Sequence, residues 1–154
     1  MTMKLDFPKI WEHVTREFRG GADSIHGSAH WRRVEENGLR IAAHSGAVVE
    51  VVRLFAVFHD SRRVSDLADE SHGERAADYV GSLQGILIDL SDEHLDLLQY
   101  ACAWHAHGRA SQDPTIGTCW DADRLDLGRC DIQPEASLMS TEFGRMLATQ
   151  SEKS

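Results

Sequence analysis

Residues 47–60 read AVVEVVRLFAVFHD, and this stretch decides the fold. Only Glu50 and Arg53 interrupt its apolar run before the polar pair His59-Asp60. The β-branched residues would also suit a buried strand, but the length of the run and the placing of its two charges favour a largely buried helix over 47–59. The sequence therefore predicts a central helix that delivers an imidazole and a carboxylate to one end of the core.

Apolar residues at helical spacing continue on both sides of this segment. Gly20-Gly21, Gly46 and Gly108 separate the elements, and Ser28, Ser71 and Ser91 are suited to cap helices. Further helices are expected over 7–19, 28–44, 72–83, 92–106, 121–128 and 141–149, with 109–119 as a loop and 150–154 as a frayed tail. No segment makes a convincing strand. We expect one all-α domain over 1–154, a helical bundle of about six to seven helices.

The composition narrows the class of protein. The 154 residues suffice for a real core, and 42% hydrophobic with 27% charged residues is ordinary for a globular domain. A net charge of −9 argues against a protein that coats nucleic-acid duplexes or anchors to a membrane through basic residues. Three cysteines without CxxC spacing are no disulfide framework, and no signal peptide or membrane-spanning run is recognised. These features predict a cytoplasmic protein.

The pair His59-Asp60 stands out chemically, because both side chains are costly to bury unless they are paired or bound to a metal. Imidazole and carboxylate together suit divalent transition metals. A second feature is His26-Gly-Ser-Ala-His30, in which His30 falls inside a helix and His26 is expected in the loop before it. A third is the segment DADRLDLG over 121–128, in which an Asp at position 121 also suits a helix N-terminus for dipole reasons.

The order of these features, HxxRV from His30, HD at 59–60 and ADRL from Ala122, resembles the HD phosphohydrolase superfamily. The resemblance covers about residues 26–129. It implies an HD-type helical bundle and a metal-dependent phosphohydrolase that acts on a phosphoester or phosphoanhydride of a small substrate, a nucleotide in particular. The ligands that it implies for one divalent metal ion (Mn, Mg, Ni, Co, Zn or Fe) are His30, His59, Asp60 and Asp123. Asp121 stays the competing choice for the last ligand.

Two further histidines are similar to residues of the dinuclear members of that superfamily. His72, in the segment SHGERAA, matches their third histidine, and His105, in AWHAHG, matches their fourth. Together with the first set they would hold a second metal ion. The loops between these motifs are much shorter here than in cyclic-dinucleotide members, so the other interpretation is that His72 and His105 line the pocket and bind substrate phosphate or water.

The sequence also offers candidates for proton transfer and for binding the substrate phosphate. Acids that could take a proton from the attacking water are Asp60, Glu74 and Asp126. Arg62 and Arg63 directly follow the HD pair, and their guanidinium groups could bind a substrate phosphate through two bonds at once. Arg33 and Arg124 are the alternatives for that role.

Two other functions fit the sequence. Some HD-fold proteins hold two irons and cleave C–C or C–P bonds with oxygen, and the six-ligand set would permit this. A non-catalytic nucleotide-binding module is the third hypothesis, against which the intact ligand set argues. No P-loop, Rossmann glycine pattern or GxSxG segment is present, so kinases, dehydrogenases and serine hydrolases have no support. The sequence leaves a homodimer open.

Overall fold

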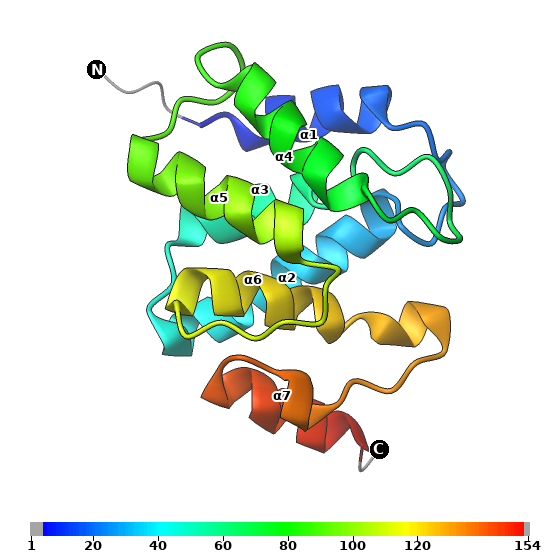
Figure 1. The fold of residues 1–154 in the computed structure, drawn as a ribbon, viewed down its shortest axis with the longest axis vertical. Helices are drawn as coiled ribbons and strands as arrows, with labels where there is room; N and C mark the ends of the chain where they lie inside the picture. The colour runs from blue at the N-terminus through cyan, green and yellow to red at the C-terminus, as the bar shows by residue number, and fades with distance from the viewer. Residues whose placement is uncertain (1–4, 153–154) are drawn as a thin grey trace.

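The structure, a computed structural model, describes residues 5–152, and in that range the chain forms seven α-helices (Figure 1). They are α1 (Phe7–Glu17), α2 (Ser28–Ser45), α3 (Val49–Phe58), α4 (His72–Leu83), α5 (Asp92–Trp104), α6 (Pro114–Arg124) and α7 (Glu142–Glu152), with short 3₁₀ helices η1 (Leu127–Cys130) and η2 (Ala136–Leu138) before α7. Within 5–152 no strand forms, and only one isolated bridge joins Gln84 to Ile88. The prediction of an all-α fold is confirmed.

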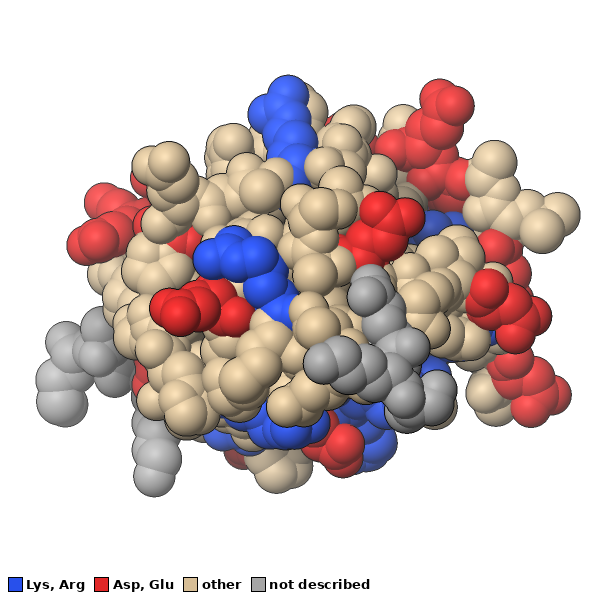
Figure 2. Space-filling view, turned by 90° about the horizontal axis from the view of Figure 1, so that it is seen from below, with Lys and Arg blue, Asp and Glu red and all other residues tan. Residues whose placement is uncertain are grey.

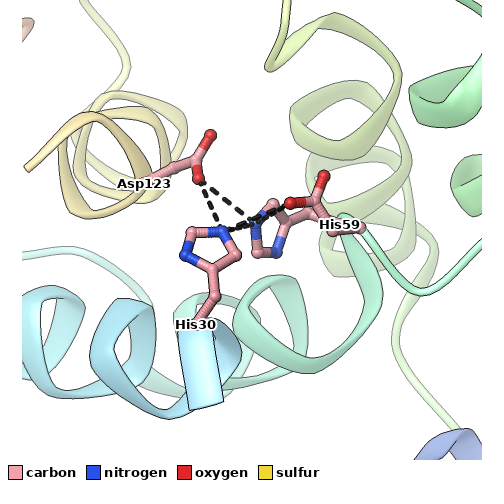
Figure 3. A group of neighbouring side chains, drawn as sticks. His30, His59 and Asp123 are labelled. Carbon is pink, nitrogen blue, oxygen red and sulfur yellow. Dashed lines mark hydrogen bonds and ion pairs between the residues drawn. The ribbon is translucent and has the colours of Figure 1, made fainter. Parts of the chain in front are cut away.

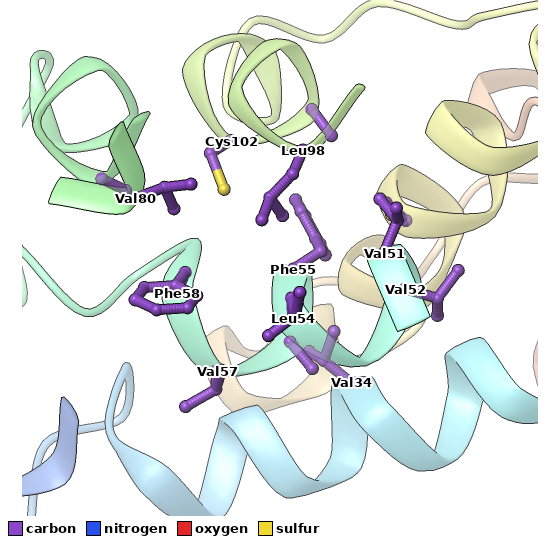
Figure 4. Packing of buried hydrophobic residues seen from close by; sticks show 14 of the residues in the cluster. Val34, Val51, Val52, Leu54, Phe55, Val57, Phe58, Val80, Leu98 and Cys102 are labelled. Atoms are coloured by element: carbon purple, nitrogen blue, oxygen red, sulfur yellow. The ribbon is translucent and has the colours of Figure 1, made fainter. Parts of the chain in front are cut away.

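Helix α3 is the centre of the molecule. It packs between α2 on one side and α5 on the other, with α6 alongside (Figure 4). Seven of its ten residues are buried, among them Leu54, Phe55 and Phe58. Removing such side chains from water stabilises the fold by about 1.5–3 kcal/mol each. The apolar run that predicted a buried helix is therefore the element around which the others pack.

The predicted helix ends are correct in part. Gly46 ends α2 in the left-handed conformation, at φ 78°, and the Ser91 side chain accepts a hydrogen bond from the His94 amide at 3.2 Å at the start of α5. Ser28 is the first residue of α2 and not its cap, which is Gly27. Ser71 precedes α4, but its side chain makes no capping hydrogen bond.

The prediction of a loop over 109–119 and a helix over 121–128 is wrong. Helix α6 begins at Pro114, and the Asp113 carboxylate accepts hydrogen bonds from the amides of Thr115 and Ile116, both at 2.9 Å. An aspartate followed by proline is a strong start signal, because the side chain caps the free amides and proline fits the first turn. The two threonines and the glycine that follow obscured the helical pattern. Asp123 consequently lies in the last turn of a helix and not in its first.

Helix α7 packs beneath α2 and α6, at the bottom of Figure 1. It extends to Glu152, and 153–154 lie outside the described residues, so the frayed tail expected over 150–154 stays a prediction. Seen from below, acidic and basic side chains are interspersed on a largely uncharged face (Figure 2). Among the described residues, no helix combines the length and the apolarity needed to cross a membrane.

Candidate metal centre

The ends of five helices meet around one carboxylate, that of Asp60. Asp60 follows the C-terminus of α3 and is 2% exposed. The side chains gathered around it are His30 in the first turn of α2, His59 at the end of α3, His72 at the start of α4, His105 at the end of α5 and Asp123 in the last turn of α6. The structure thus brings together residues that are up to 93 positions apart in the chain, as the distance from His30 to Asp123 along the sequence shows.

The first group comprises His30, His59, Asp60 and Asp123, whose candidate ligand atoms all lie within 4.8 Å of one another. The Nε2 atoms of His30 and His59 are 3.0 Å apart. One oxygen of Asp123 lies 3.1 and 3.3 Å from them. Dashed lines in Figure 3 mark these two contacts. Oδ2 of Asp60 lies 3.2 and 3.5 Å from the same two nitrogens. The four side chains enclose a space that could hold one metal ion.

The second group uses the other oxygen of Asp60. Oδ1 lies 3.3 Å from Nε2 of His72 and 3.2 Å from Nε2 of His105. These two nitrogens are 3.0 Å apart, and all three side chains are buried. Asp60 therefore faces both groups, with one oxygen directed to each.

Hydrogen bonds on the far side of each ring fix the tautomers in the first group. Nδ1 of His59 lies 3.0 Å from the carbonyl oxygen of Phe55, which can only accept, so this nitrogen carries the proton. Nδ1 of His30 lies 2.7 Å from an oxygen of Asp126 and donates to it. Each ring is left with a lone pair on Nε2, the atom that faces Asp60 and Asp123.

The second group is arranged in the same way. Nδ1 of His105 donates to the carbonyl oxygen of Cys102 at 2.7 Å, and Nδ1 of His72 donates to the carbonyl oxygen of Asp69. A histidine that donates its other N–H to a carbonyl or carboxylate is the usual arrangement around a protein-bound metal. The Nε2 atoms of all four rings thus face inward, where each can offer its lone pair to a metal ion.

This donor set fits a metal ion. Two lone pairs at 3.0 Å repel each other, and carboxylate oxygens beside them add to the repulsion, unless a proton or a metal ion lies between them. The Asp123 oxygen that faces the two histidines is buried and has no hydrogen-bond partner in the part of the chain that the structure describes. Two imidazoles with two carboxylates suit Mn, Fe, Co, Ni or Zn, and the second group offers the same atom types.

In the metal-free protein, a proton on His30 reduces the repulsion between these lone pairs and carboxylate oxygens. Burial lowers the pKa of His30, but hydrogen bonds to Asp123, Asp126 and Asp60 outweigh it and raise that pKa to about 10. Burial raises the pKa of Asp60, but the adjacent imidazoles, His59 first, bring it well below its ordinary value. The centre therefore retains negative carboxylates and attracts cations.

A glycine sets the spacing of the second group. A Cβ on Gly73 would lie 2.6 Å from the carbonyl oxygen of Cys102 and 2.9 Å from that of Ala103. The start of α4 can therefore approach the end of α5 only because residue 73 has no side chain. This contact brings His72 to His105.

His26 takes part in the centre more than the sequence indicated. It lies in the loop before α2, as expected, but it is only 5% exposed. Its Nδ1 is 3.4 Å from Oδ2 of Asp60, and its Nε2 is 3.2 Å from the carbonyl oxygen of Asp66. The spacing of four residues from His30 was the signal that could have placed both rings on the same side.

The two candidate acids in the segment 121–126 have separate positions. Asp121 lies outside the cluster: it accepts hydrogen bonds from the amides of Ser140 and Thr141, at 2.7 and 2.8 Å, and holds the start of α7. Asp126 contacts the outer nitrogen of His30 and the guanidinium of Arg33, at 2.7 and 2.8 Å. It lies behind the ring and orients it.

Glu74 does not face the centre. Its side chain is half exposed and lies 3.5 Å from Nε2 of His107, on the outside of α4. Gly73, its neighbour in the sequence, faces α5 instead, because consecutive residues of a helix lie on different sides of the helix axis. The structure offers no role in proton transfer for Glu74.

Two of the four arginines proposed for the substrate point elsewhere. The guanidinium of Arg62 lies over the ring of Tyr79, at 4.6 Å from its centroid. Arg124 donates to the carbonyl oxygen of Leu138 at 2.8 Å and packs near Trp120. Consecutive residues such as 62 and 63 diverge, so only one of that pair reaches the cluster.

Arg63 and Arg129 reach the centre from different directions. Nε of Arg63 is 3.5 Å from Oδ1 of Asp60. Nη2 of Arg129 is 3.9 Å from Oδ2 of Asp60 and 3.8 Å from Oδ1 of Asp123. Sequence reasoning did not single out Arg129, although it follows the DADRLDLG segment directly on η1.

Comparison with known proteins agrees with this fold. The crystal structure of a protein described as a predicted HD superfamily hydrolase, from an uncultured Thermotogales bacterium, superimposes with a TM-score of 0.74. The match covers 95% of this chain and 84% of that one, at 23% sequence identity. The chain has the HD-domain fold. The resemblance seen in the sequence is thereby confirmed for the fold, and no family model or curated protein sequence matches the chain.

Proposed function

We propose that this chain is a metal-dependent phosphohydrolase that cleaves a phosphoester or phosphoanhydride bond of a small substrate, with nucleotides as the first class to test. The observation that carries the proposal is the convergence of four histidine Nε2 lone pairs on the two oxygens of Asp60. The HD-domain fold supports it, because the structural neighbour is described as a hydrolase of that superfamily.

Under this proposal His30, His59, Asp60 and Asp123 would hold one divalent ion, and Asp60, His72 and His105 would hold a second. Such an ion supplies Lewis-acid charge and makes water a stronger nucleophile at neutral pH. The protein contributes a buried site whose ligands are oriented before the ion arrives, since each Nδ1 is already hydrogen-bonded.

Asp60, Asp126 and Arg63 would serve in proton transfer, in positioning a ligand and in binding the substrate phosphate. Of the three acids considered for proton transfer, only Asp60 faces both groups, and we assign the proton of the attacking water to it. Asp126 is a positioning residue that holds His30. Arg63 adds positive charge next to Asp60, where a phosphate oxygen of the substrate would be stabilised.

A dinuclear iron oxygenase is the second candidate, and the completeness of the second group favours it. Both oxygens of Asp60 are used, so the arrangement is equally suited to two irons. The two functions differ in a simple observable. An iron oxygenase purifies with two irons and visible absorption and consumes oxygen, whereas a hydrolase releases phosphate under anaerobic conditions.

The deciding experiment is a hydrolysis screen on the metal-free protein supplied with Mn, Mg, Co, Ni, Zn or Fe. Nucleotides and generic phosphoesters are incubated with and without oxygen, and phosphate release is measured. Release that depends on the metal and not on oxygen supports the proposal. Saturable nucleotide binding without turnover, in every metal, would instead identify the chain as a binding module.

A further inference from the structure

The guanidinium of Arg129 lies against the candidate metal centre with most of its donors unused. Its side chain is 9% exposed. Nη1 donates to the carbonyl oxygen of Asp126 at 2.8 Å, which holds the group in place on η1. Nε is buried and has no hydrogen-bond partner among residues 5–152. Nη2 is 3.8 and 3.9 Å from its two nearest carboxylate oxygens, on Asp123 and Asp60, beyond hydrogen-bonding distance.

These distances differ from those of an arginine whose role is to neutralise carboxylates. Such pairs form two parallel bonds of about 2.7–2.9 Å. Arg129 instead lies beyond bonding distance of both acids, and its buried Nε–H has no acceptor among the described residues, which is costly in the interior. An oxygen atom of a bound ligand would supply that acceptor.

The charges of the side chains around Arg129 indicate the charge of the ligand that fits there. Asp60, Asp123 and Asp126 carry three negative charges. Three positive charges face them, those of Arg63, of Arg129 and of Arg33, which is paired with Asp126. One divalent ion therefore leaves an excess of two positive charges, and a second ion increases that excess. Once an ion draws on the carboxylate oxygens of Asp60 and Asp123, these oxygens attract Arg129 less. A doubly charged anion restores the balance better than a singly charged one.

We propose that Arg129 binds the substrate phosphate and selects for a terminal phosphate, a dianion, over a phosphodiester monoanion. The inference rests on the proposed function and defines its substrate class: phosphomonoesters and compounds that end in a phosphate group. Arg129 would supply Nε and Nη2 to two oxygens of that group, a fork that lysine cannot reproduce.

The test compares Arg129→Gln and Arg129→Lys with the native protein after loading with Mn²⁺. Arg32→Gln is the matched control, since Arg32 is exposed on α2 and lies over Trp11, 5.0 Å from the ring centroid. Substrates are p-nitrophenyl phosphate, a dianion, and bis(p-nitrophenyl) phosphate, a monoanion. Binding of inorganic phosphate is measured separately by calorimetry, and metal content and circular dichroism are recorded for each variant.

We expect Arg129→Gln to lower kcat/KM for the monoester by about 10- to 100-fold, the size of a lost charge-assisted contact, and to change that for the diester by less than about threefold. Phosphate affinity should fall by a similar factor. Arg129→Lys should keep the metal and lose part of the monoester activity. This variant tests the inference even if the glutamine variant folds poorly.

Equal losses for both substrates, or none, would overturn the inference while leaving the proposed function intact. If the native protein hydrolyses neither substrate but binds phosphate through Arg129, the proposed hydrolase function would be wrong and the phosphate-binding role of Arg129 would stand. Native protein that neither hydrolyses nor binds phosphate would refute both.

Discussion

Nδ1 of His30 lies 2.7 Å from a carboxylate oxygen of Asp126, and that bond determines which nitrogen of His30 faces the centre. The carboxylate lies on the outer side of the ring and also binds Arg33 at 2.8 Å. Asp126 thus fixes the tautomer and the ring orientation of a residue 96 positions earlier in the chain. A carboxylate behind a metal-binding histidine also makes the ring a stronger ligand.

Asp126→Ala should therefore weaken metal binding by about 10- to 100-fold, with the helical fold retained. Asp126→Asn should have a smaller effect, because its amide oxygen can still accept from Nδ1. Metal affinity is measured by competition with a chelator of known strength. Asp78→Asn, on the exposed face of α4, is the control for loss of one negative charge. Unchanged affinity in the alanine variant would show that Asp126 does not orient His30.

The two groups predict different results for their histidines. His59→Ala removes a ligand of the first group only, and His105→Ala a ligand of the second only. We expect His59→Ala to abolish phosphoester hydrolysis and tight metal retention, and His105→Ala to reduce the metal content from two ions to one if both sites fill. Asp60→Ala should affect both groups, because each oxygen faces one of them.

Elemental analysis of each variant after gel filtration gives the number of ions, and circular dichroism separates metal loss from unfolding. The opposite pattern, in which Asp60→Ala keeps its metal and its activity, would mean that the HD pair has another role. If the native protein contains one ion and His105→Ala contains one ion as well, the second group binds substrate or water and not a metal ion.

Local patterns predicted most of this architecture, and the errors have physical causes. The 47–59 run decided the core because an apolar segment of that length must be buried, and His59-Asp60 followed from its end. The start of α6 was missed because two threonines and a glycine after Pro114 weaken the periodicity, although Asp113 caps the helix. Arg62 could not be distinguished from Arg63, since the turn that directs one to Tyr79 and the other to Asp60 depends on tertiary contacts.

Gly73 gives a test of the second group that changes no ligand. Gly73→Ala places a methyl group within 2.6 and 2.9 Å of two backbone carbonyl oxygens of α5, so α4 and α5 must separate. We expect a loss of about 1–3 kcal/mol in the free energy of unfolding and weaker metal binding at His72 and His105. Gly81→Ala is the control on the same helix, because its Cβ meets only the side-chain amide of Gln99. Equal stability of the two variants would contradict the close approach.

The raised pKa of His30 predicts how the stability of the metal-free protein depends on pH. In the folded protein this pKa is about 10, against 6.5 for an ordinary histidine, because three aspartates hydrogen-bond to the ring and outweigh its burial. A group whose pKa is raised on folding stabilises the fold fully below pH 6.5, and the stabilisation is lost as the pH rises towards 10. A bound metal ion takes the place of that proton, so it should remove the dependence.

Melting temperatures measured from pH 6.5 to 10 should therefore fall in the presence of a chelator, and much less with saturating metal. His30→Gln should abolish the fall in the metal-free protein, since the variant has no imidazole to titrate. Comparing each protein with and without metal at the same pH separates this effect from the titration of surface lysines and of other groups. A metal-free native protein whose melting temperature is constant over this range would show that no proton is held between His30 and its three aspartates.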